Sequence, residues 1–220
     1  MSRRSYIYWY PLLLALAWIA AWLVNLDLRS AWHWAVTTDA IYWIAMKFLI
    51  WLIPVCTLIL VVERKNLVDF LELRRFWKGT AWALLAGLVV LAADFLIGAH
   101  SSVKHFALPE PNAVFLNGVV MAPITEEITF RGFFLERLQL NGMSFWIGNL
   151  LTSVVFVAMH IIGWSFQGRI GSPVHLVQMV APVLFLSLLF GWLKQKTGSL
   201  NAPLVFHILN NFYGFALKSA

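Results

Sequence analysis

The chain has 220 residues, of which 61% are hydrophobic and only 12% are charged, and its mean hydropathy is +0.78. Soluble domains are typically about 45–50% apolar and about 25% charged, so the composition excludes an ordinary soluble domain and predicts an integral membrane protein. The net charge of +6 does not indicate a nucleic-acid partner, because the basic residues lie between the apolar runs, where the positive-inside rule accounts for them.

Seven apolar runs are long enough to cross a bilayer, which takes roughly 20 residues of helix. They cover approximately residues 7–24, 41–62, 79–97, 114–138, 145–162, 174–193 and 202–217. The pattern predicts an all-α fold, a polytopic transmembrane helical bundle of about seven spans. We expect residues 1–220 to form one integral membrane domain.

The first two runs each contain a feature that needs an interpretation. The first follows basic residues as a signal peptide does, and residues 15–17 read Ala-Leu-Ala, similar to a cleavage site. That site would fall inside the apolar run rather than after it, so we favour a retained span. In the second run, Lys47 lies near one end, from which its ammonium group can reach the interface.

Loop charges orient the predicted spans. With the N-terminus in the cytoplasm, ten lysines and arginines fall inside and four fall outside, which favours seven spans with the C-terminus outside. We expect a bacterial inner (cytoplasmic) membrane protein. Residues 63–78 bring apolar and basic side chains together on one side of a helix, a pattern typical of a helix in the cytoplasmic interface; an ordinary basic loop explains the segment equally well.

The fourth run contains three ionisable residues within six positions, Glu126, Glu127 and Arg131. Each such group costs about 2.5–3.5 kcal/mol on membrane insertion scales, so intramembrane charges indicate a functional site. Glu127 and Arg131 are four residues apart and share a helix face, whereas Glu126 points about 100° away. We therefore expect Arg131 to neutralise Glu127 and Glu126 to face a polar cavity. A structural ion pair would leave the second acid unexplained.

Later runs contain further polar side chains at comparable expected depth. His160 lies in the fifth, and His207 and Asn211 share one face of the seventh. A carboxylate in a poorly hydrated cavity can act as a general base toward water, and imidazole and amide N–H groups can stabilise an oxyanion. Two histidines and a glutamate (Glu126, His160 and His207) can alternatively bind zinc. The residues leave both options open.

These motifs resemble those of the CAAX protease and bacteriocin-processing (CPBP/Abi) family, also called type II CAAX prenyl endopeptidases. The resemblance spans residues 112–215 and rests on Glu126-Glu127-x-x-x-Arg131, Phe156-x-x-x-His160, and His207-x-x-x-Asn211 preceded by Gly198-Ser199-Leu200-x-x-Pro203. It implies a glutamate-dependent intramembrane protease, with no cofactor expected. It further implies that Glu126 activates water with help from His160, that His207 and Asn211 stabilise the oxyanion, and that Glu127 and Arg131 support the site.

The sequence thus predicts an endopeptidase that acts on a membrane-anchored or lipidated protein or peptide within the lipid bilayer. The main alternative is a non-catalytic relative, an immunity or partner-binding membrane protein that keeps the charged core for structure. A proton-coupled transporter is a third reading, but such proteins usually show internal repeats and paired broken helices, and neither is visible here.

Overall fold

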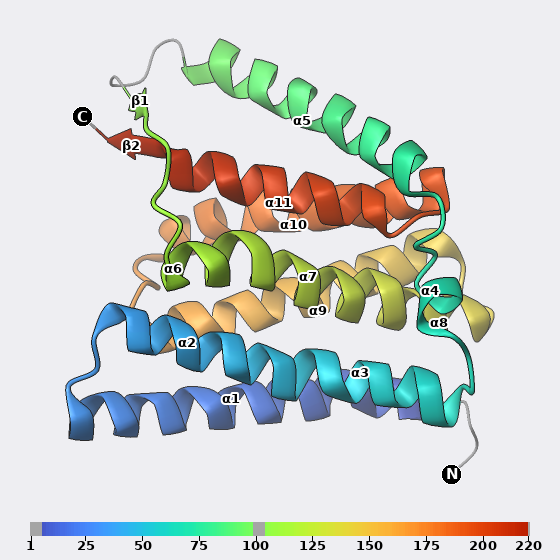
Figure 1. Ribbon diagram of the computed structural model, residues 1–220, viewed down its shortest axis with the longest axis horizontal. Helices are drawn as coiled ribbons and strands as arrows, with labels where there is room; N and C mark the ends of the chain where they lie inside the picture. Colours follow the sequence, from blue (N-terminus) through green and yellow to red (C-terminus); the bar gives the residue numbers. More distant parts are fainter. Residues whose placement is uncertain (1–5, 99–103, 220) are drawn as a thin grey trace.

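The computed structural model describes residues 6–98 and 104–219, and long helices lying side by side dominate it (Figure 1). The first helix, α1, runs over Tyr6–Trp32. The second is continuous from Val36 to Val62 and is divided into α2 (Val36–Met46), the π-helical η1 (Lys47–Leu52), α3 (Ile53–Thr57) and the π-helical η2 (Leu58–Val62). A single turn, α4 (Leu67–Phe70), leads into α5 (Phe76–Gly98).

The fourth long helix, Ala113–Leu140, consists of α6 (Ala113–Phe115), η3 (Leu116–Met121), α7 (Ala122–Glu127), η4 (Ile128–Leu135) and α8 (Glu136–Leu140). It is followed by α9 (Phe145–Phe166), α10 (Pro173–Thr197) and α11 (Asn201–Ala216). Two three-residue strands, β1 (Lys104–Phe106) and β2 (Leu217–Ser219), pair antiparallel and tie the loop before α6 to the end of the chain. This pairing is a small departure from the purely helical prediction.

In the described part of the chain, six helices are long and apolar enough to cross a membrane: Tyr6–Trp32, Val36–Val62, Phe76–Ala93, Ala113–Leu140, Phe145–Phe166 and Pro173–Thr197. The seventh predicted span is α11, which has 16 residues and lies alongside α10 (Figure 1). The start of α1 and the end of α11 lie at opposite ends of the bundle (Figure 1), as an odd number of crossings requires.

Lys47 does not reach the interface, and that prediction is wrong. The second helix begins at Val36 rather than near residue 41, so Lys47 lies well inside the span, where the residue is 9% exposed. The earlier start is stabilised by contacts with α1, because Asn25 donates a hydrogen bond to Asp39 (2.8 Å) and Arg29 lies 3.9 Å from the same carboxylate. These contacts satisfy the polar residues of the first turn.

The predicted interfacial helix over residues 63–78 is only one turn long. Asn66 caps that turn by accepting a hydrogen bond from the backbone N–H of Val68, and Glu72 ends it with a left-handed backbone (φ 53°). Phe70 and Leu71 are buried in the main core rather than exposed to lipid. The segment therefore acts mostly as a packed connection between the second helix and α5.

An aromatic cluster fills the core between α1, the second helix and α9. Trp22 packs on Trp43 with ring centroids 4.1 Å apart, and Trp18 contacts Trp51 at 5.2 Å. Trp51 in turn meets Phe130 of η4 at 5.4 Å. Because aromatic rings bury large areas and pack with fixed geometry, this cluster fixes the position of η1 and η4, two π-helical segments that contact α7.

The fourth helix is irregular around Glu126 and Glu127. Pro123 lies in the first turn of α7, and π-helical segments precede and follow α7. Proline cannot donate the backbone hydrogen bond of a regular helix, and single-turn π-bulges in α-helices often occur at functional sites. The irregular backbone therefore coincides with the charged residues.

Candidate active site

Glu127, Arg131 and His207 form a fully packed ionic centre. Arg131 Nη1 donates a hydrogen bond to Glu127 Oε1 (3.0 Å), and both side chains are 0% exposed. The same oxygen accepts a hydrogen bond from His207 Nδ1 at 2.8 Å. The predicted pair between Glu127 and Arg131 is therefore present, and it also anchors α11 through His207.

The guanidinium group of Arg131 is held from two further helices. Its Nη2 donates to the backbone carbonyl (3.0 Å) and to the hydroxyl (2.5 Å) of Ser187 on α10. Its Cζ lies 4.5 Å from the ring centre of Phe156 on α9 and 5.1 Å from that of Phe190 on α10. Phe190 also stacks on the imidazole of His207, with ring centres 4.6 Å apart. Arg131 thus joins four helices around one charge.

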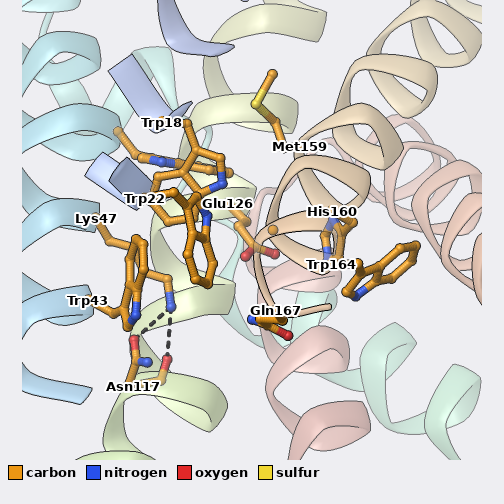
Figure 2. A pocket seen from close by; sticks show the side chains of 12 residues that line it. Trp18, Trp22, Trp43, Lys47, Asn117, Glu126, Met159, His160, Trp164 and Gln167 are labelled. Carbon is orange, nitrogen blue, oxygen red and sulfur yellow. Dashed lines mark hydrogen bonds between the residues drawn. The ribbon is translucent and has the colours of Figure 1, made fainter. Parts of the chain in front are cut away.

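Glu126 faces a cavity of about 190 Å³. The side chain of Glu126 is 11% exposed. Arg131 pairs with Glu127 and not with Glu126. The cavity is lined by aromatic and polar side chains from α1, the second and fourth helices and α9 (Figure 2). They are Trp18, Trp22, Trp43, Lys47, Trp51, Asn117, Glu126, Met159, His160, Gly163, Trp164 and Gln167. The volume is sufficient for several water molecules, each of which takes about 30 Å³ in the liquid.

His160 lines the same cavity, and its orientation is fixed by the backbone of α9. Nδ1 donates a hydrogen bond to the carbonyl of Phe156 (3.0 Å). The ring packs between those of Phe156 at 4.5 Å and Trp164 at 5.6 Å. Because a neutral imidazole carries one proton, this bond makes Nε2 the hydrogen-bond acceptor. Figure 2 shows the ring close to Glu126.

The imidazole ring of His207 lies between the carboxylates of Glu126 and Glu127. While Nδ1 donates to Glu127, Nε2 lies 3.8 Å from Glu126 Oε2, which is too long for a direct hydrogen bond. In the neutral form of the ring, Nε2 is an acceptor, so two acceptors face each other across this gap. A water molecule that donates to both atoms would satisfy them.

Asn211 shares the helix face of His207, as predicted, but does not line the cavity of Glu126. Its Nδ2 donates to the carbonyl of Gly118 in η3 (2.9 Å), and its Oδ1 accepts from Asn210 (3.4 Å). One of its two amide hydrogens is therefore used to hold α11 against the fourth helix.

Lys47 and Asn117 are two residues of the site that reasoning from the sequence misses. Lys47 Nζ donates to Oδ1 of Asn117 (2.6 Å) and lies 3.5 Å from the backbone carbonyl of the same residue. Both residues line the cavity of Glu126 (Figure 2). A lysine inside an apolar run is a usable signal, but a helix that starts near residue 41 puts Lys47 close to the interface, whereas the helix begins at Val36.

The zinc option requires three side chains that converge on one point. Among residues 6–98 and 104–219, no group of three His, Cys, Asp or Glu side chains is arranged to hold a metal ion. The Nδ1 hydrogen bonds of His207 to Glu127 and of His160 to a backbone carbonyl are also typical of metal-bound histidines, so they do not decide the question. The predicted ligands Glu126, His160 and His207 lie near one another without forming a three-ligand group, so we derive no step through a metal.

Comparison with known proteins identifies the part of the chain that carries the site. Residues 109–213 match the family model described as "Type II CAAX prenyl endopeptidase Rce1-like", which confirms the resemblance seen in the motifs. A relative from Escherichia coli, "Uncharacterized 24.3 kDa protein", is 26% identical over 141 residues, covering 59% of this chain and 60% of that protein. The chain thus aligns with less than two thirds of that relative's length. No solved structure gives a significant match.

Proposed function

Because residues 109–213 match the type II CAAX prenyl endopeptidase Rce1-like family, we propose that this chain is an intramembrane endopeptidase. It hydrolyses a peptide bond in a membrane-anchored or lipidated protein or peptide. The observation that carries the proposal is the difference between the surroundings of the two carboxylates, Glu126 and Glu127. Oε1 of Glu127 accepts hydrogen bonds from both Arg131 and His207, whereas Glu126 faces a cavity that also contains the acceptor nitrogen of His160.

Glu126 is the general base of the proposed reaction. A water molecule donates one hydrogen to the Glu126 carboxylate and the other to the Nε2 atom of His160, which the bond to Phe156 leaves as an acceptor. The oxygen lone pair of that water attacks the substrate carbonyl carbon while Glu126 takes the proton. General-base catalysis of this type contributes about 10²–10⁴-fold. Glu126 then returns the proton to the leaving amine as the C–N bond breaks.

The remaining residues support this step. Arg131 neutralises Glu127, and Glu127 fixes the ring of His207 through Nδ1. The family resemblance assigns stabilisation of the oxyanion to His207 and Asn211. In the geometry seen, Nε2 of the neutral His207 ring is an acceptor 3.8 Å from Glu126, and Asn211 keeps one amide hydrogen that Gly118 does not use. The reaction needs no resident metal in this proposal. The enzyme belongs to the cytoplasmic membrane of a bacterium, with its N-terminus in the cytoplasm.

The test is cleavage by purified protein in lipid nanodiscs. The probes are an internally quenched peptide with a prenylated cysteine near its C-terminus, and the same peptide anchored by an unrelated acyl chain. We expect wild-type protein to cleave at least one probe and Glu126→Gln to cleave neither, while Glu110→Gln, at an exposed carboxylate, retains wild-type activity. A folded E126Q protein with undiminished cleavage would refute the role of Glu126. Absence of cleavage by wild type would favour an immunity or partner-binding protein.

A further inference from the structure

Lys47 is a buried cation for which the proposed reaction has no use so far. The residue is 9% exposed and lines the cavity that contains Glu126. In the described part of the chain, its hydrogen-bond partners are the side-chain and backbone oxygens of Asn117, and it forms no ion pair within 4 Å. A lysine in a membrane interior is costly and is a functional candidate by default.

A purely structural role does not account for the charge. The hydrogen bond from Lys47 to Asn117 holds η1 against η3, but a neutral donor would make the same bond without the cost of burying an ammonium group. Arg131 already neutralises Glu127. Glu126 lines the same cavity and interacts electrostatically with Lys47. Once Glu126 takes the proton of the water, the positive charge of Lys47 is available to the negative charge that forms on the substrate.

The oxyanion of the proposed reaction lacks a prearranged donor in the geometry seen. His207 donates its Nδ1 hydrogen to Glu127, which leaves Nε2 as an acceptor in the neutral ring. Asn211 donates to Gly118 and does not line the cavity. His160 also presents an acceptor to the cavity. Lys47, with three N–H donors, faces the cavity and does not depend on a prior proton transfer.

We propose that Lys47 is a further catalytic residue, whose ammonium group donates a hydrogen bond to the substrate carbonyl oxygen as that oxygen gains negative charge. This inference rests on the proposed function. When water attacks, the electron pair of the C=O bond moves onto the oxygen facing Lys47, and the proton of the water goes to Glu126. When the C–N bond breaks, the pair returns to the carbonyl and the amine takes the proton from Glu126. Lys47 keeps all its protons.

The walls of the cavity strengthen this interaction. Trp18, Trp22, Trp43 and Trp51 line the same cavity as Lys47, and Figure 2 labels the first three beside the lysine. Large rings of this kind limit the water that can reach the ammonium group. A charge–charge interaction at 4 Å rises from about 1 kcal/mol in water to about 4 kcal/mol at an effective dielectric constant of 20. Donors fixed before the reaction begins are the arrangement that lowers an electrostatic barrier most.

The kinetic test compares Lys47→Met with Lys47→Gln, Lys47→Arg and the control Lys78→Met, which removes an exposed lysine. Loss of one oxyanion donor lowers kcat by about 10²–10³-fold, so we expect K47M and K47Q to lose that much with KM unchanged. K47R keeps the charge and loses less. K47Q can still donate to Asn117, so it reports on the charge even if K47M does not fold.

A binding measurement separates this inference from the proposed function. A peptide phosphonate, an anionic stand-in for the tetrahedral intermediate, should bind K47Q more weakly than wild type by about the factor lost in kcat. Kinetics within about threefold of wild type, or a loss confined to KM, would overturn the role of Lys47 while leaving Glu126 as the base. If wild-type protein neither cleaves the probes nor binds the phosphonate, both the endopeptidase function and the role of Lys47 are refuted.

Discussion

Replacement of Arg131 by methionine tests whether the ionic centre is the structural foundation of the site. The side chain is 0% exposed and donates to Glu127 at 3.0 Å and to Ser187 at 3.0 and 2.5 Å. Arg131→Met leaves the Glu127 carboxylate buried without its cation. Breaking one partner of a buried pair costs about 3–5 kcal/mol, and we expect a loss of that size in the free energy of unfolding, measured in detergent by thermal or denaturant titration.

The double variant decides whether this cost comes from the unpaired charge. Glu127→Gln removes the charge and leaves an amide oxygen that can still accept from His207, so the protein with both substitutions should be more stable than R131M alone. As a control, Arg74→Met removes a cation from the exposed pair with Asp69, whose side chains are 75% and 54% exposed, and should cost no more than about 1 kcal/mol. Strictly additive losses in R131M and E127Q would refute the reasoning.

Three further predictions concern packing, topology and metal dependence. Gly191→Ala should destabilise the protein by about 1–3 kcal/mol in the same unfolding assay, because a Cβ at this position would lie 1.8 Å from Asn149 Oδ1; unchanged stability would contradict the tight contact of α9 and α10. In a Cys56→Ala background, Glu110→Cys should react with a membrane-impermeant maleimide in intact cells and Lys78→Cys only after permeabilisation, and the reverse pattern would invert the proposed orientation. A chelator should leave peptide cleavage unchanged, and a loss that zinc restores would show that the site binds metal.

The sequence predicted most of the helices because the apolar runs are long and the loops are charged. What it could not predict depends on contacts between helices. The second helix begins at Val36 because Asn25 and Arg29 of α1 contact Asp39, and without that contact the polar residues 37–39 indicate a loop. A start near residue 41 therefore predicts Lys47 at the interface, although Lys47 is buried within the span.

The candidate site shows the same division between local and long-range information. Glu127 and Arg131 are four residues apart, so their pairing followed from helix geometry alone. The bond from His207 to Glu127 joins residues 80 positions apart, and it depends on how α11 packs against the fourth helix. No periodicity reveals which acid a distant histidine will contact, and the bond of Asn211 to the backbone of Gly118 was equally inaccessible.

In the proposed reaction, Glu126 activates water for peptide-bond hydrolysis inside the bilayer. The most direct measurement is the single-turnover rate of peptide cleavage by Glu126→Gln relative to wild type, with the folded state of both proteins established beforehand. We expect a rate reduced by at least about 100-fold, the lower bound for losing a general base. A rate equal to that of the wild-type protein would contradict it.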